Sequence, residues 1–239
     1  SYAFDAHVVE NLKKEGLLGP DLLFVHGSAF TDLELDLIRE AGAGISATPE
    51  TELQMGMGFP VAHRAHAHGV RTGLGIDIVS NYSGDMFLPM RLALQSTRAL
   101  RNAEYEARKR APSVIEPKAE SVLRMATIGG AEAINMQKEI GTLEKGKSAD
   151  IAIISTGAIH MTPSFDAVGA LVMNARPSDI STVLVNGKIV KRDGKLVGVD
   201  WPSLRSRFAA SANRIMDGFR TVDIPATTEA TRPIIPHLE

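Results

Sequence analysis

The sequence predicts an α/β fold that continues into a small antiparallel β unit. Three short apolar runs alternate with segments of helical spacing, which is the pattern of parallel strands joined by crossover helices. Further along, Asn186-Gly187 separates two β-forming runs, and an Asn-Gly pair supplies the positive φ angles of a type I′ hairpin turn. We therefore expect a parallel sheet covered by helices, followed by a separate hairpin-based sheet.

The expected parallel strands are short and apolar. They cover residues 22–25, 45–47 and 70–76. Thr31 marks the start of the helix after the first strand, because Glu34 follows three residues later, as in a capping box. The short links between these elements favour parallel strands with right-handed crossovers.

The other expected elements rest on similar local signals. Residues 48–59 are rich in Met and Gly and are expected to form a loop, and Pro117 is expected as the first residue of a helix. The remaining expected elements, in chain order, are helices at residues 60–68 and 88–108, a strand at 149–155, the hairpin at 182–190, a second turn at Asp193-Gly194 and a helix at 201–219.

The composition excludes several classes of function. Of 239 residues, 44% are hydrophobic, and the net charge of −2 with no long run of one sign gives no indication of a nucleic-acid partner. The absence of cysteine excludes disulfides, Cys-zinc sites and a Cys nucleophile, and fits the reducing cytoplasm in which we expect the protein. No apolar stretch reaches the ~20 residues of a membrane span. The first residues lack an initiator Met and a signal-peptide pattern, so we expect the chain to be the middle of a longer protein.

Two ionisable residues follow expected parallel strands. His26 comes after the first strand and Asp77 after the third. Because the carboxyl ends of parallel strands meet at one edge, both side chains are expected at the same site. An imidazole and a carboxylate there suit a divalent metal and its water, whose pKa the metal lowers from ~16 to roughly 7. The alternative interpretation is structural, with His26 as a hydrogen-bonded residue and Asp77 as a turn cap.

Three further histidines are close together in the sequence. His63, His66 and His68 lie in the expected helix at residues 60–68. We expect this helix at the surface and its histidines solvated, so we do not interpret them as a metal cluster.

Several segments together resemble the amidohydrolase superfamily. Residues 140–151, IGTLEKGKSADI, resemble its IGSLxxGKxADL segment, which leads from a barrel to a β-sandwich, and residues 183–197 resemble the hairpin that follows. Residues 25–27 resemble the sixth barrel strand with its His, and residues 73–77 resemble the eighth strand with its metal-binding Asp. The resemblance covers nearly the whole chain and is nearest to the cytosine/guanine deaminase and triazine chlorohydrolase branch.

This resemblance implies a fold and an activity. Residues 1–138 are expected to be the C-terminal part of a (β/α)₈ TIM barrel, residues 139–200 part of a small β-sandwich domain, and residues 201–239 a C-terminal helix and tail. The implied activity is hydrolysis of C–N bonds by metal-bound hydroxide, as in amidohydrolases and heterocyclic amine deaminases. One divalent metal ion, zinc or else iron, is implied as cofactor with Asp77 as a ligand, and His26 is carried over as a catalytic residue.

The departures from the family pattern are equally informative. The resemblance implies a His-x-His pair after the first strand and a His-x-x-Glu motif after the fifth. We expect this chain to begin after the fifth strand, so we expect only part of an active site and name the N-terminal half of the same protein as a partner. Residues 47–52, ATPETE, replace the His-Cys-Pro-x-Ser-Asn segment of many members. We expect Glu50 and Asn81 to bind a small-molecule substrate, and the protein to be a homo-oligomer.

Two other functions stay open at this point. A non-catalytic amidohydrolase-like assembly protein is possible in principle, but it has no need of both His26 and Asp77. A hydrolase that displaces halide or thiol instead of ammonia uses the same attacking hydroxide, and the sequence does not separate it from a deaminase.

Overall fold

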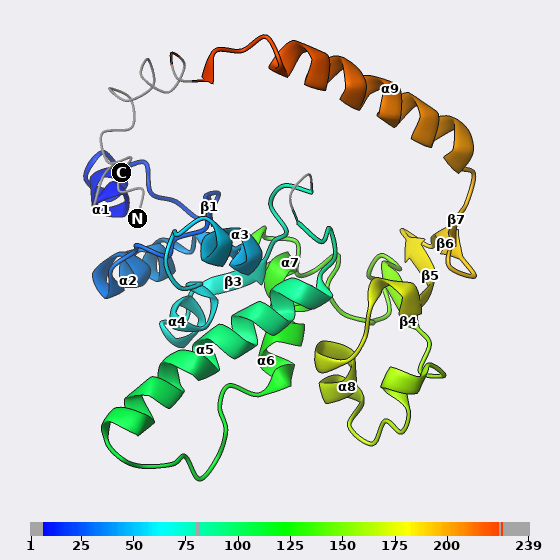
Figure 1. Cartoon of the computed structure of the whole chain (residues 1–239). Coiled ribbons are helices and arrows are strands. Elements are labelled where there is room, and N and C mark those ends of the chain that lie inside the picture. The colour runs from blue at the N-terminus through cyan, green and yellow to red at the C-terminus, as the bar shows by residue number, and fades with distance from the viewer. Residues whose placement is uncertain (1–6, 80–81, 225, 227–239) are drawn as a thin grey trace. The chain divides into compact units, whose positions relative to one another are not determined.

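The computed structural model describes residues 7–79, 82–224 and 226 of the chain. These residues form two compact units, one that extends to Lys195 and one that begins at Leu196 (Figure 1). The first unit contains helices and two sheets, and the second contains one long helix. The expected α/β organisation is thus present in the first unit.

The parallel sheet is built from three adjacent strands in chain order. They are β1 (Leu23–Val25), β2 (Gly44–Ala47) and β3 (Arg71–Leu74). Both pairings are parallel, with Phe24 opposite Ile45 and Ile45 opposite Thr72. The central strand is the most enclosed, since Ile45 and Ala47 are fully buried. The three strands expected from the apolar runs are confirmed; β1 and β3 are shorter than their runs, and β2 begins one residue earlier than expected.

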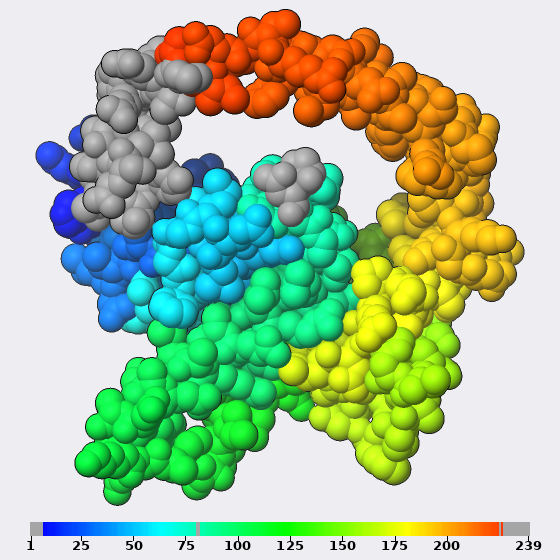
Figure 2. Space-filling view, viewed as in Figure 1, coloured from blue at the N-terminus to red at the C-terminus, as the bar shows by residue number. Residues whose placement is uncertain are grey.

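Helices cover the sheet and connect its strands (Figure 1). In chain order they are α1 (Val8–Lys14), α2 (Asp32–Ala41), α3 (Pro49–Gln54), α4 (Ala62–Ala67) and α5 (Phe87–Ala107). Leu35 and Ile38 of α2 are fully buried, as expected for an amphipathic crossover helix. In Figure 2, the second half of α5 and the segment after it (green) stand away from the blue and cyan segments of the same unit.

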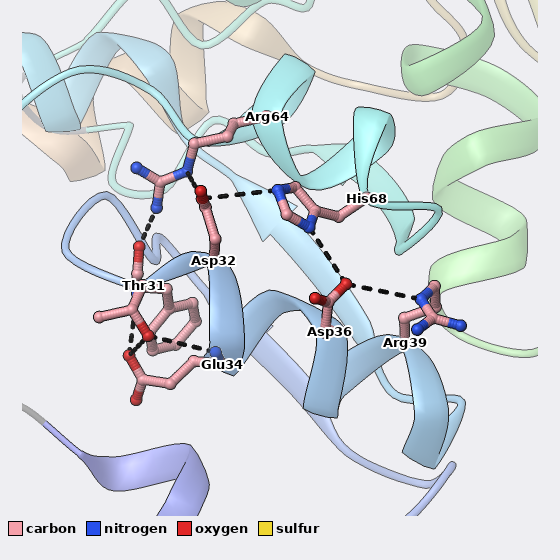
Figure 3. Close-up of polar contacts among 8 residues, drawn as sticks. Thr31, Asp32, Glu34, Asp36, Arg39, Arg64 and His68 are labelled. Carbon is pink, nitrogen blue, oxygen red and sulfur yellow. Dashed lines mark hydrogen bonds and ion pairs between the residues drawn. The ribbon is translucent and has the colours of Figure 1, made fainter.

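Polar contacts fix the start of α2 and connect it to α4 (Figure 3). The capping box is confirmed, because the Thr31 hydroxyl accepts from the Glu34 amide at 3.2 Å and the Glu34 carboxylate accepts from the Thr31 amide at 3.0 Å. His68 lies between two carboxylates of α2, 3.5 Å from Asp32 and 3.2 Å from Asp36. These contacts connect the helix after β1 to the helix after β2.

Two sequence expectations about helices were wrong. Residues 49–54 of the expected loop form α3, with Pro49 at a position where its missing N–H is not needed. Pro117 is not helical, because Lys118 is still extended and the next helix, α6 (Ala119–Arg124), begins after it. The carbonyl of Pro117 instead accepts from the guanidinium of Arg98, at 3.1 and 2.8 Å.

A continuous helical segment packs its backbone directly on the sheet. It consists of α6, the π-helix η1 (Met125–Gly129) and α7 (Gly130–Ala133). A Cβ atom on Gly129 would lie 2.6 Å from the Thr72 carbonyl oxygen, and one on Gly73 would lie 2.8 Å from the Gly130 Cα. Glycine is therefore required on both sides of this contact, through which the helical segment packs against β3.

The antiparallel sheet has the strand order β4-β5-β6-β7. Its strands are β4 (Ile151–Ile154), β5 (Ile180–Val185), β6 (Lys188–Arg192) and β7 (Lys195–Leu196). The hairpin between β5 and β6 is confirmed, with φ of 48° at Asn186 and 75° at Gly187. Between β4 and β5 lie the 3₁₀ turns η2 (Ile159–Met161) and η3 (Pro177–Asp179) and the helix α8 (Ala167–Met173).

The second unit contains α9 (Trp201–Phe219), as expected from the spacing of residues 201–219. Its start is capped by the Asp200 carboxylate, which accepts from the Ser203 amide at 3.3 Å. Across the residues that the structure describes, no helix is both long and apolar enough to cross a membrane.

Candidate active site at the carboxyl edge of the parallel sheet

The residues that follow the three parallel strands meet at one edge of the sheet. His26 comes directly after β1, Thr48 directly after β2, and Asp77 shortly after β3. The His26 amide donates to the Ser46 carbonyl at 3.0 Å, and the Gly75 amide donates to the Ala47 carbonyl at 2.7 Å. These bonds extend the sheet beyond the strands and hold the three chain segments side by side.

His26 and Asp77 share an uncommon backbone conformation. Their φ angles are 69° and 67°, in the left-handed region that non-glycine residues seldom adopt. Asp tolerates this region better than His, because its short side chain can hydrogen-bond locally. Strained residues of this kind are enriched at active sites, where the surrounding structure holds them in place. The geometry therefore favours a functional interpretation of both strand-end residues.

The imidazole of His26 is held through one nitrogen. Its Nδ1 lies 2.6 Å from the Thr48 hydroxyl and 3.8 Å from Oε1 of Glu52. Its Nε2 has no hydrogen-bond partner among the residues that the structure describes. Because the ring is held at Nδ1, its Nε2 is available to contact a ligand.

Glu52 is a buried carboxyl next to this ring. Its side chain is 0% exposed, Oε1 accepts from the Thr48 amide at 2.8 Å, and Oε2 has no partner within the described residues. Burial raises the pKa of Glu52 to about 7, while the Thr48 hydrogen bonds lower it and the charge of Asp77 raises it further. Glu52 thus lies beside the His26 ring and within reach of the charge of Asp77.

Sequence reasoning missed Glu52 and favoured Glu50. Glu50 is turned to the loop after β3, where its carboxylate accepts from the Ser83 hydroxyl at 3.0 Å and from the Ser83 amide at 3.3 Å. The available signal for Glu52 was its place at the end of the ATPETE segment, where the family pattern has Asn. Asn81, the other expected substrate contact, lies outside the described residues.

Four of the six buried polar atoms without partners in the described part of the chain lie on segments that follow the parallel strands. Atoms of this kind lie on the segment after β1 (Ser28 Oγ), on α3 (Thr51 Oγ1 and Glu52 Oε2) and on the segment after β3 (Tyr82 Oη). Buried hydroxyls and carboxyls are almost always hydrogen-bonded in native proteins. The carboxyl edge is therefore suited to a polar ligand, ordered water or another chain segment.

The donors at this edge fit part of a metal site. Asp77 is exposed and supplies a carboxylate, and His26 supplies a free imidazole nitrogen. Catalytic zinc sites usually have three protein ligands, and no group of three or more His, Cys, Asp or Glu that could hold a metal occurs within residues 7–79, 82–224 and 226. The described residues can thus contribute to a metal centre but do not complete one.

His63 is engaged with helix side chains rather than solvated. Its Nε2 lies 3.0 Å from the Ser121 hydroxyl and its Nδ1 lies 3.0 Å from the Thr97 hydroxyl. Burial lowers the pKa of His63 to about 4, and the positive charges of His66 and Arg101 lower it further. The expectation of a solvated side chain was wrong for His63, because α4 packs against α5 and α6 at this point.

Comparison with known proteins is consistent with this arrangement. A 5-methylthioadenosine/S-adenosylhomocysteine deaminase of Moorella thermoacetica is 33% identical over 198 residues, which are 82% of this chain and 44% of the relative. A 5′-deoxyadenosine deaminase of Methanosarcina barkeri is 30% identical over 195 residues, or 81% of this chain and 42% of the relative. The chain thus spans less than half the length of these relatives.

Solved structures match as well. An adenosine deaminase of Xanthomonas campestris with bound zinc superposes with a TM-score of 0.75 and 28% identity, over 89% of this chain and 46% of that protein. A zinc complex of an atrazine chlorohydrolase from Arthrobacter aurescens gives a TM-score of 0.73 at 24% identity, which shows a shared fold, over 84% of this chain and 43% of that protein. The amidohydrolase family itself matches residues 3–190, and the chain belongs to that family.

Proposed function

We propose that this chain is the C-terminal part of a metal-dependent hydrolase that removes an amino group from a purine-type heterocycle. The observation that carries the proposal is that Asp77 and His26, whose Nε2 is free, both follow strands at the same carboxyl edge and both adopt the left-handed conformation. The names of the relatives, which are deaminases of adenosine-like nucleosides, support the substrate class.

The fold of the whole protein is part of the same proposal. We infer that β1, β2 and β3 are strands six to eight of a closed (β/α)₈ barrel, and that the antiparallel sheet is part of a β-sandwich. In this proposal the barrel part ends at residue 138 and the β-sandwich part ends at residue 200. The other barrel strands and the remaining metal ligands would come from the N-terminal half of the same protein.

The roles of the residues follow from their chemistry. Asp77 would hold a zinc ion, which when bound supplies a Lewis acid that lowers the pKa of water. His26 would donate or accept a hydrogen bond at the reacting group through Nε2, and the Asp77 carboxylate would hold a proton during the reaction. Glu50 and Asn81 are proposed as substrate contacts, and Glu50 would have to exchange its Ser83 partner for the substrate.

The proposal is tested on the full-length protein. Purified protein is incubated with adenosine, 5′-deoxyadenosine, 5′-methylthioadenosine and S-adenosylhomocysteine, and ammonia release is measured together with bound metal. We expect ammonia from at least one nucleoside, loss of the activity after chelation and recovery with zinc. A metal-free protein that releases no ammonia from any of the four contradicts the proposal and favours a non-catalytic assembly role.

A further inference from the structure

Thr48, Glu52 and His26 form one hydrogen-bonded chain at the carboxyl edge. The Thr48 hydroxyl lies 2.6 Å from His26 Nδ1 and 3.5 Å from Oε1 of Glu52, and the Thr48 amide donates to the same Oε1 at 2.8 Å. Thr48 is 2% exposed and Glu52 is fully buried. Contacts among buried groups are little screened by solvent, so this chain can fix the orientation of the ring.

The Thr48 hydroxyl is not used by the helix that it precedes. Thr48 is the N-cap residue of α3, but its side chain makes no capping hydrogen bond. Its methyl group is confined on the other side, because a Cβ on Gly75 would lie 3.1 Å from Thr48 Cγ2. The hydroxyl is therefore held toward His26 and Glu52 by the packing around it.

The donor and acceptor capacities of these three side chains indicate which of them donates in each hydrogen bond. A hydroxyl has a single hydrogen, and an ionised carboxylate only accepts. Above the pKa of Glu52, at about 7, the carboxylate is ionised, so the Thr48 hydrogen is directed to Oε1 and the hydroxyl oxygen accepts from His26 Nδ1–H. The negative carboxylate 3.8 Å from Nδ1 stabilises the same arrangement. Nε2 is then left as the unprotonated, outward nitrogen of a neutral ring.

We propose that Thr48 and Glu52 are positioning residues that hold His26 with its proton on Nδ1 and present Nε2 to the substrate. This inference rests on the proposed function, because it assigns the residues through which His26 acts. It also accounts for the ATPETE segment, since Thr48 and Glu52 are both among the residues that depart from the family pattern.

The first test is kinetic and uses the full-length protein with the nucleoside that it deaminates. Replacing the hydroxyl by a methyl in Thr48→Val should lower kcat about 10- to 100-fold, the usual cost of losing a partner that orients a functional His. Thr48→Ser restores the hydroxyl and should recover most of kcat. Glu52→Gln keeps the size of the side chain and should lower kcat with little effect on KM.

A double-mutant cycle separates positioning from general damage. If Thr48 acts through His26, adding Thr48→Val to His26→Ala should cause little further loss of kcat. The matched control is Thr97→Val, which removes an equivalent contact, Thr97 Oγ1 to His63 Nδ1 at 3.0 Å, away from the carboxyl edge, and should leave kcat unchanged. Equal losses from Thr48→Val with and without His26 would overturn the inference.

The second test does not depend on activity. In ¹⁵N-histidine-labelled full-length protein at about pH 8, where Glu52 is ionised, the His26 signals, assigned with His26→Ala, should show a protonated Nδ1 and an unprotonated Nε2. Thr48→Val should convert them to a mixture of tautomers. A His26 proton on Nε2, or signals that Thr48→Val leaves unchanged, would refute the positioning role. Because this result is obtained even if no nucleoside is deaminated, failure of the inference and failure of the proposed function are distinguishable.

Discussion

At the scale of single residues, Asp77 gives the sharpest prediction. In the full-length enzyme, Asp77→Asn should reduce turnover by more than ~100-fold, because loss of an outer partner of a metal ligand already costs 10- to 100-fold. The fold should persist, since Asn has nearly the same size and also tolerates the left-handed conformation. Steady-state kinetics, zinc content and thermal unfolding check this. Asp36→Asn, which changes an exposed carboxylate on α2, is the control and should retain activity.

His63 predicts a pH dependence of stability. Its folded pKa of about 4 lies below the unfolded value of 6.5, so the folded state favours the neutral imidazole. The contribution of His63 to the free energy of unfolding is therefore fully present above pH 6.5 and is lost as the pH falls toward 4. The shift corresponds to at most roughly 3 kcal/mol. The free energy of unfolding of the wild type should therefore fall more steeply over this range than that of His63→Gln, measured by denaturant titration. Equal slopes for the two proteins would contradict the assignment. His66→Gln removes a positive charge that lowers the pKa of His63, so it should reduce the slope only in part.

The strand-end residues could be predicted from the sequence, but Glu52 could not. His26 and Asp77 end apolar runs that are visible in the sequence, and parallel strands place their ends together. The burial of Glu52 depends on the Thr48 contacts and on how α3 packs against α5, neither of which has a sequence pattern. Glu50 was chosen as the added acid, yet the fold turns it to Ser83.

At the scale of elements, the contact between η1 and β3 depends on glycine. Gly129→Ala should destabilise the protein by about 1–3 kcal/mol, the usual cost of overpacking, because the new Cβ would lie 2.6 Å from a backbone oxygen that cannot move freely. Thermal or urea unfolding measures this. Gly157→Ala is the matched control, since its Cβ would meet only the Ser155 hydroxyl at 3.9 Å. Similar stabilities of the two variants would show that β3 and η1 can separate at little cost.

The elements differ in how strongly their sequences mark them. The hairpin at Asn186-Gly187 and the capping box at Thr31 were predicted because each depends on a local rule of backbone geometry or hydrogen bonding. The helix α3 was missed because the Met- and Gly-rich residues after it favour a loop, while its own six residues are too few to show a helical period. The π-helix η1 has no sequence signature of its own and follows from packing on β3.

At the scale of the whole molecule, the parallel sheet has open sides. Among the described residues, β1 and β3 each pair with β2 alone, while a closed barrel needs eight strands. Apolar side chains of β1 are exposed, with Leu23 at 41% and Val25 at 51%. We therefore expect these strands to be completed by the N-terminal half of the same protein.

The last prediction follows from the size of this exposed surface. Burying one large apolar side chain contributes ~1.5–3 kcal/mol, and several such contributions are comparable with a whole-domain stability of ~5–15 kcal/mol. Residues 1–239 expressed alone should thus unfold without a sharp transition and release no ammonia, whereas co-expression with the upstream half should restore both a cooperative transition and zinc binding. Analytical ultracentrifugation, calorimetry and the ammonia assay measure the two cases. A monomer of residues 1–239 that unfolds cooperatively, binds zinc and deaminates a nucleoside would show that the three strands suffice, and that the missing ligands are supplied within this chain.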